Sequence, residues 1–239
     1  MKTQREVHET EYINSISDFT PINNFVICKK VSDNLNARTK AGIYKISPFY
    51  NRDQFLPLNA DRVFEVAVLP KEFNKDNAEK TSYWNTDLEV KVGDIVISCF
   101  LNSLNAKVLI TDDGSEYRLI SYFALIVALR KEKVICLNGY FLFTRMLEEI
   151  KTTLWVPNQK KRNYDTRLGL VEYVGNPVHY YHRDGGGDFD KGINIQRGDK
   201  VLFLTSYSLF APPLENEKFR IMDKDYYYAQ RYRLAGKVE

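Results

Sequence analysis

The side chains best suited to metal chemistry gather in one stretch, residues 176–192, which reads NPVHYYHRDGGGDFDKG and contains two of the three histidines, His179 and His182. A metal site needs several ligands that converge on one point. These histidines are three residues apart, so in a strand their side chains would point to opposite faces, and no third ligand has suitable spacing. DGGGDFD also departs from the pattern of a calcium-binding loop. We expect no bound metal here.

Motifs for covalent or nucleotide chemistry are missing from the sequence. It contains no P-loop, no H-E-x-x-H, no nucleophile elbow and no Gly-rich strand-turn-helix unit for a dinucleotide. The cysteines, Cys28, Cys99 and Cys136, lie far apart, form no C-x-x-C pair and are odd in number. This pattern is typical of buried reduced thiols. We therefore expect a protein that is not an enzyme and binds no cofactor.

Composition places the chain among soluble globular proteins. Of its 239 residues, 44% are hydrophobic and 27% are charged, and 34 basic residues against 31 acidic ones give a net charge of +3. The basic residues are scattered except for QKKRNYDTR at 159–167, which is more typical of a solvated loop than of a nucleic-acid surface. No apolar run reaches the roughly 18 residues of a membrane span, and the N-terminus has no apolar signal core. We expect a cytoplasmic protein that binds neither nucleic acid nor membranes.

The elements that must position any site are strands. Segments rich in Val, Ile, Tyr and Phe and bounded by turn residues predict strands at 23–31, 61–69, 94–101, 106–113 and 116–129. Only TRMLEEIKTT, at 144–153, is ambiguous between helix and strand. Many short strands with long polar loops favour an all-β fold of small barrels or sandwiches.

One pattern occurs twice along the chain. Four pairs of segments align: PINNFVICKK (21–30) with CLNGYFLFTR (136–145), RTKAGIYKISP (38–48) with EIKTTLWVPNQ (149–159), FEVAVLP (64–70) with GLVEYVGNP (169–177), and VKVGDIVISCF (90–100) with IQRGDKVLFLT (195–205). In each Gly-Asp the Gly suits a corner with positive φ, and the Asp can bond nearby backbone amides. We predict a polar N-terminal extension over 1–17 and two copies of one β domain over 18–131 and 132–239.

With this order of elements the chain resembles the small co-chaperonins, the GroES family. The resemblance rests on PINNFVICKK, the Thr-Lys-Ala-Gly-Ile loop, VFEVAVL, VKVGDIVI and SEYRLISYFALIVAL in the first half, and on CLNGY, GLVEYVGNP and RGDKVLF in the second. It covers almost all of residues 20–239. Plastid co-chaperonins carry two such domains in one chain. The resemblance implies two tandem GroES-like small β-barrels with long loops, and it makes residues 176–192 a roof hairpin.

The resemblance also implies a binding site. In this family a mobile loop after the first strand carries an apolar tripeptide that docks on a large, ATP-hydrolysing chaperonin ring. The matching residues are Ile43, Tyr44 and Lys45 in the first half and Leu154, Trp155 and Val156 in the second. The first set departs from the pattern by ending in Lys, and the second has two threonines where the family has a Gly pair. TTLWVP is equally compatible with a core strand that Pro157 ends.

Two functions follow as hypotheses. The first is a co-chaperonin-like protein that forms rings, caps a chaperonin and assists protein folding. The second is an architectural bacteriophage protein, a virion ring or decoration component without chaperone activity whose partners are other virion proteins. Both imply a homo-oligomer through edge strands, which we expect at FVICKK, ALIVAL, YFLFTR and RLAGKV.

Overall fold

The computed structural model describes several stretches of the chain, separated by gaps. These are residues 10–31, 62–74, 76–77, 82–99, 106–147, 164–182, 194–203, 218–221, 224–231 and 234–238. Their secondary structure consists of strands and two short 3-10 helices, η1 (Ile16–Asp18) and η2 (Tyr122–Ala124). The predicted all-β class is therefore confirmed for the described residues. Closure of the sheets into barrels stays a prediction.

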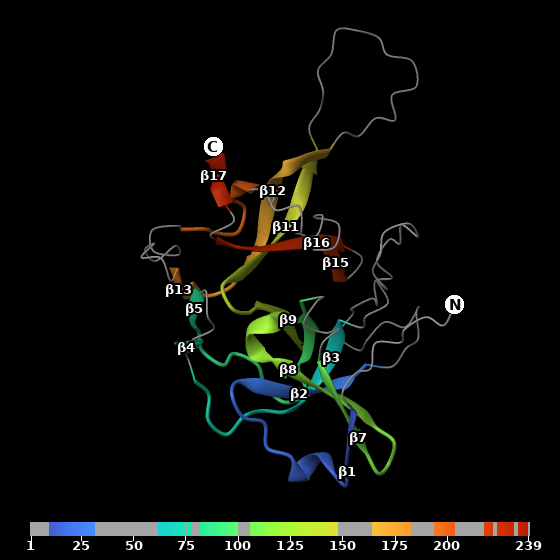
Figure 1. The fold of residues 1–239 in the computed structure, drawn as a ribbon. Coiled ribbons are helices and arrows are strands. Elements are labelled where there is room, and N and C mark those ends of the chain that lie inside the picture. The colour runs from blue at the N-terminus through green and yellow to red at the C-terminus, as the bar shows by residue number, and fades with distance from the viewer. Residues whose placement is uncertain are drawn as a thin grey trace, which may run out of the picture.

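The largest sheet has eight strands in the order β1-β7-β8-β2-β3-β6-β9-β10 (Figure 1). Its members are β1 (Thr10–Ile13), β2 (Phe25–Lys30), β3 (Val63–Val68), β6 (Ile95–Ser98), β7 (Lys107–Thr111), β8 (Glu116–Ser121), β9 (Leu125–Arg130) and β10 (Lys133–Cys136). Neighbouring strands are antiparallel except for β1 and β7, which are parallel. The β-branched and aromatic residues that predict these strands form their buried faces.

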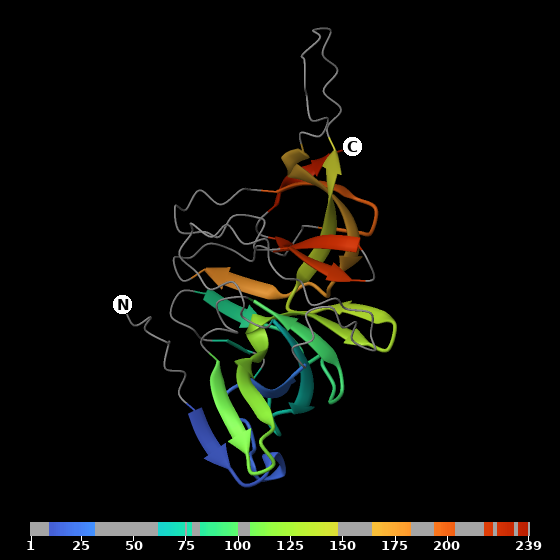
Figure 2. The same ribbon diagram turned by 90° about the vertical axis from the view of Figure 1, so that its right-hand side faces the viewer.

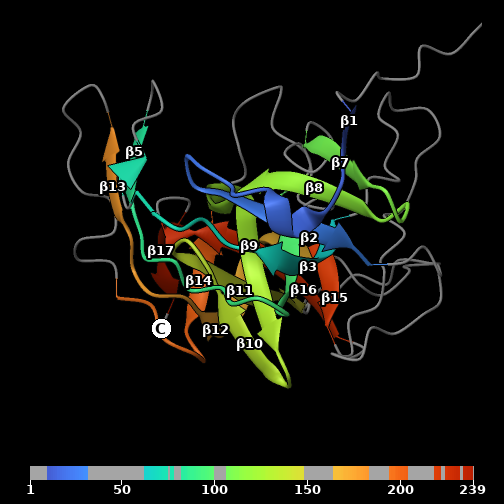
Figure 3. The same cartoon turned by 90° about the horizontal axis from the view of Figure 1, so that it is seen from below.

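A second sheet has six strands in the order β15-β16-β11-β12-β14-β17, and a third has three in the order β13-β5-β4. Their members are β4 (Asp76–Asn77), β5 (Ser82–Asn85), β11 (Tyr140–Leu147), β12 (Tyr164–Val174), β13 (His179–His182), β14 (Lys200–Phe203), β15 (Lys218–Ile221), β16 (Lys224–Gln230) and β17 (Leu234–Val238). In the smallest sheet β13 pairs with β5, so strands from the two halves of the chain lie side by side (Figure 3).

The two large sheets share one strand order. The series β7-β8-β2-β3-β6-β9 in the first sheet corresponds to β15-β16-β11-β12-β14-β17 in the second. We term the first six strands the first unit and the other six the second unit. The second unit lies above the first in Figures 1 and 2, with β10 between them.

The strand register of the units agrees as well. The pairing of β2 with β3 shifts between Ile27 and Cys28, and that of β11 with β12 shifts between Leu142 and Phe143. These are matched positions when Pro21 is aligned with Cys136. A second pair of shifts, in β6 with β9 and in β14 with β17, also falls at matched places. The pairing thus gives the same correspondence as the aligned segments of the sequence.

The two cores use the same positions with different side chains. In the first unit Cys28 of β2 and Phe64 of β3 belong to one core cluster, whereas the second unit has Phe143 and Gly169 at these positions. A Cβ on Gly169 would lie 2.4 Å from Cδ2 of Phe143. The ring of Phe143 therefore occupies space above Gly169 that any side chain there would need. At these two positions each core holds one large and one small residue, and the large residue lies on the first strand in one unit and on the second strand in the other.

The prediction that FVICKK and YFLFTR form edges is wrong. These segments form β2 and β11, each of which has a neighbour on both sides. Their nearly continuous apolar runs are buried from both faces, as expected of central strands. ALIVAL forms most of β9, which is not an edge either because β10 pairs with it. RLAGKV provides β17, which ends its sheet within the described residues.

Three further features differ from the sequence-based expectation. The run at 116–129 is divided by η2 into β8 and β9. Strand β1 lies within the expected N-terminal extension, yet it joins the large sheet beside β7. The side chains of Glu11 and Lys107 form an ion pair between these two strands. Strand β10 follows the expected domain boundary but pairs with β9 of the first unit.

Candidate assembly interface

The six residues predicted to bind a chaperonin lie outside the described residues. These are Ile43, Tyr44, Lys45, Leu154, Trp155 and Val156. The chain around the first three joins β2 to β3, and the chain around the others joins β11 to β12. Both strand pairs are direct neighbours and correspond in the two units. The candidate loops therefore connect equivalent strands.

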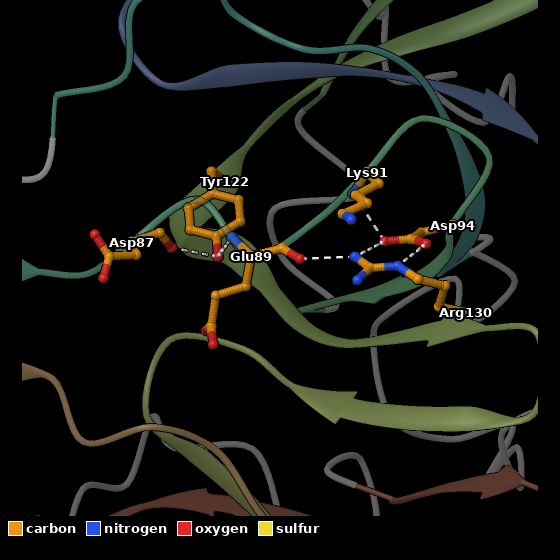
Figure 4. A network of polar contacts seen from close by, with 6 residues as sticks. All are labelled: Asp87, Glu89, Lys91, Asp94, Tyr122 and Arg130. Atoms are coloured by element: carbon orange, nitrogen blue, oxygen red, sulfur yellow. Dashed lines mark hydrogen bonds and ion pairs between the residues drawn. The ribbon is translucent and has the colours of Figure 1, made fainter.

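The Gly-Asp pairs form equivalent corners. In the first unit the N–H of Gly93 donates to the carbonyl of Val66 at 2.8 Å, and the carboxylate of Asp94 accepts the N–H of Lys91 at 2.8 Å (Figure 4). In the second unit Gly198 donates to Val171 at 2.8 Å, and Asp199 accepts from Gln196 at 2.7 Å. Gly93 and Gly198 have φ values of 85° and 90°. The motif occurs twice because each unit needs the same glycine-dependent turn before β6 or β14.

Each corner aspartate also holds a cation from the last strand of its unit. Asp94 is buried and accepts two bonds from the guanidinium of Arg130, at 2.8 and 2.9 Å. This interaction raises the pKa of Arg130. Asp199 binds Lys237 of β17 at 2.6 Å, and the ammonium group together with the N–H of Gln196 lowers the pKa of Asp199. The corners thereby tie β9 and β17 to the start of β6 and β14.

Acid is expected to weaken the second corner. Because the folded-state pKa of Asp199 is lowered, its contribution to stability is present above the unfolded value of about 3.9 and is lost as pH falls through the folded-state pKa. Asp199→Asn keeps the shape of the side chain but cannot carry the charge. Urea denaturation of both proteins between pH 6 and pH 2 should show a difference in midpoint that shrinks below about pH 4. A difference that is independent of pH would contradict this assignment.

The junction between the units is built by the residues between β10 and β11. Leu137 is 0% exposed and belongs to the core of the first unit, and its N–H donates to the carbonyl of Ile126 at 2.9 Å. Asn138 is equally buried, and its Nδ2 donates to the carbonyls of Tyr122 and Leu125 at 2.8 and 2.9 Å. The start of the second unit is thus inserted into the end of the first.

An apolar cluster extends this junction across both units. Its buried members are Ile97, Ile126, Val127, Leu129, Cys136, Leu142, Ile221, Tyr226 and Tyr228. Tyr228 packs edge-on against Tyr140, and its hydroxyl accepts a bond from Nη2 of Arg62 at 3.1 Å. Because first-unit and second-unit residues share one desolvated cluster, the two units pack as one body at this surface.

Polar contacts surround the cluster. Arg231 is 4% exposed, and its guanidinium donates to the carbonyls of Gly139 at 3.2 Å and Gly175 at 2.9 Å. Asn176 of the second half donates to the carboxylate of Glu89 in the first at 2.6 Å. Partial burial raises the pKa of Glu89. The pairing of β13 with β5 adds a further link between the halves.

The residues that correspond to those of the junction lie near the two ends of the chain, and they are exposed. Strand β9 is buried over most of its length, whereas the last four residues of its counterpart β17 are exposed. Ile22 corresponds to Leu137 but is 67% exposed. Asn23, which corresponds to Asn138, is exposed too. The aligned sequences predict that these residues are equivalent in the two halves, but they do not predict that Leu137 and Asn138 lie at a buried interface. The Asn-Asn and Asn-Gly turns before β2 and β11 are the sequence signal that could have indicated it.

The cysteines agree with the expectation of reduced thiols. Cys28 and Cys136 are buried, Cys99 is half-buried, and none forms a disulfide. Burial raises the pKa of both Cys28 and Cys136. The described stretches contain no group of three or more His, Cys, Asp or Glu that could hold a metal ion. No helix in the described part of the chain has the length and apolar character that a membrane crossing requires.

Fold and interface define an all-β protein with two units of one strand order joined through a buried junction. A comparison with protein-family models finds no family that matches this chain, and a comparison with curated proteins finds no match either.

Proposed function

We propose that this protein is a co-chaperonin-like, ring-forming protein that caps a large chaperonin ring and assists protein folding through apolar-tipped loops. The observation that carries the proposal is the shared strand order and register of the two units. It agrees with the two tandem GroES-like domains that the sequence resembles. The protein itself performs no catalysis in this role, because ATP hydrolysis belongs to the chaperonin.

The places of the candidate loops support this role. The tripeptides at 43–45 and 154–156 lie between equivalent paired strands, β2 and β3 in one unit and β11 and β12 in the other. Every copy of the chain would therefore present two loops at corresponding places. Ordering a free loop costs about 1 to 2 kcal/mol per residue, so each loop binds weakly and many copies together bind tightly. Burial of Leu154 or Trp155 contributes about 2 to 3 kcal/mol per site.

Refolding of a stringent client by a chaperonin tests the proposal. The wild-type protein is expected to increase the yield of refolded client, and Leu154→Ala/Trp155→Ala is expected to abolish the increase, because it removes the apolar contacts of the second loop. Thr152→Ala/Thr153→Ala in the same loop is the matched control and should retain the activity. Circular dichroism establishes that all variants are folded.

Two results would contradict the proposal. Loss of activity in the threonine control as well would mean that the apolar tip is not the binding element. Absence of assistance by the folded wild-type protein would instead favour the architectural alternative, a component of a bacteriophage particle.

A further inference from the structure

We propose that residues 10–19 form a removable cap, which covers on the first unit the apolar face that the first unit itself covers on the second, and which thereby opposes assembly of the chain. This inference rests on the proposed ring-forming function and adds a regulation to it. The observation that carries it is a pair of equivalent apolar clusters, one on each unit, with different covers.

Each unit has an apolar face outside its own core. Ile27 lies in a different cluster from its neighbours Val26 and Cys28, because successive side chains of a strand point to opposite faces. Leu142 is likewise in a different cluster from the residues before and after it. We term these second clusters the outer faces. The strand registers match four of their residues in pairs, namely Ile27 with Leu142, Val68 with Tyr173, Tyr117 with Tyr226, and Leu119 with Tyr228.

The outer face of the second unit is covered by the first half of the chain. The cover is supplied by strands β6, β9 and β10, whose buried side chains complete the shared apolar cluster described above. These side chains are Ile97, Ile126, Val127, Leu129 and Cys136. One unit of this protein thus fits closely onto the outer face of another.

The outer face of the first unit is covered by the N-terminal segment instead. Ile13 of β1, Ile16 of η1 and Phe19 pack against the cluster that contains Ile27 and Tyr117. In Figures 1 and 2, β1 lies at the end of the first unit that is farthest from the second unit. The cap therefore continues the stacking order, with the N-terminal segment on the first unit and the first unit on the second.

The cap is held more weakly than a unit would be. Neither β1 nor η1 contains a buried residue, and Ile13, Ile16 and Phe19 are only half-buried. The side chain of Tyr12 is 79% exposed. Because hydrophobic stabilisation grows with the apolar area removed from water, this segment stabilises its outer face less than the fully buried cover of the second unit does. Segments with few buried apolar contacts open at low free energy, so the cap can leave while the units stay folded.

The competitor for the face under the cap is a unit of another copy. The contact within the chain shows that a unit is the surface that fits an outer face. The chain's own second unit cannot supply it, because the shared cluster already fixes that unit on the other side of the first. An outer face accepts one cover at a time, so the apparent affinity of another copy is reduced to the fraction of chains whose cap is open.

A disulfide lock on the cap tests the inference in the full chain. Tyr12 of β1 opposes Ile110 of β7, and neither belongs to the outer face. Neighbouring strands lie about 4.8 Å apart, which is within the Cα range of a disulfide. Tyr12→Cys/Ile110→Cys should keep the cap closed when oxidised and release it when reduced. In sedimentation velocity, the oxidised protein is expected to need a concentration about tenfold or more higher for association than the reduced one. The wild-type protein, with and without reductant, is the control.

A loosened cap should have the opposite effect. Ile16→Ser/Phe19→Ser removes apolar contacts of the cap and leaves the outer face itself unchanged. It is expected to lower the concentration at half-association by about fivefold or more. Tyr12→Ser is the matched control, because it changes an exposed side chain of the same segment and should have no effect. Circular dichroism establishes that all variants are folded.

Either of two results would overturn the inference. One is equal association of the locked protein in its oxidised and reduced forms, and the other is a loosened cap that associates no more readily than the wild-type protein. Association that follows the state of the cap, without refolding of a client, would overturn the proposed function alone. Client refolding that the oxidised lock supports as well as the reduced protein does would overturn this inference alone.

Discussion

Leu137→Ala is expected to lower the free energy of unfolding by about 2 to 5 kcal/mol. Leu137 is 0% exposed and packs in the core of the first unit, although it precedes the first strand of the second. Its truncation leaves a cavity at the point where the two units are joined, and the strands around it can close only part of that space. Urea denaturation followed by circular dichroism measures the loss.

Ile22→Ala is the matched control for this change. Ile22 holds the corresponding place before β2, but it is largely exposed in a single chain. Its truncation should change the free energy of unfolding by no more than about 0.5 kcal/mol when measured at a concentration too low for assembly. Equal losses in the two variants would contradict the assignment of Leu137 to a buried junction and of Ile22 to the surface.

Exchanging the core pair of the second unit for that of the first is expected to show strong coupling. Phe143→Cys alone removes a buried ring and should destabilise the protein by about 3 kcal/mol. Gly169→Phe alone inserts a ring where Phe143 already lies 2.4 Å from the site of a Cβ, and should cost about 1 to 3 kcal/mol or more. The double variant recreates the Cys28 and Phe64 pair of the first unit.

The double variant should therefore be more stable than the sum of the single losses, by about 1 to 3 kcal/mol. The reason is that the second ring enters the space that the first has left. Free energies of unfolding for the four proteins of the cycle, measured in urea, give the coupling directly. Additive losses would mean that the two rings do not compete for one space, and that the cores of the units are not equivalent at these positions.

Much of the fold could be predicted because it depends on local signals. Runs of Val, Ile, Tyr and Phe between turn residues predict the strands, and the two Gly-Asp pairs predict corners whose glycines have positive φ. The alignment of PINNFVICKK with CLNGYFLFTR gives the register that the paired strands adopt. Each of these features is decided within a few residues of chain.

Features that depend on distant partners could not be predicted in the same way. The residues TEYI give no indication that β1 pairs in parallel with β7. The apolar run of β2 indicates burial but not which strands flank it, so its central place was missed. Leu137 and Ile22 occupy matched places in the pattern, and only the packing of the second unit onto the first makes one buried and the other exposed. The predicted chaperonin-binding residues lie outside the described stretches.

The central claim is that the chain repeats one unit and, in its proposed function, forms a ring of several copies. The solution mass, measured by sedimentation velocity over a range of concentrations, tests it most directly. The proposed function predicts a species with the mass of several chains. A wild-type protein that keeps the mass of a single chain up to its highest soluble concentration would contradict the claim.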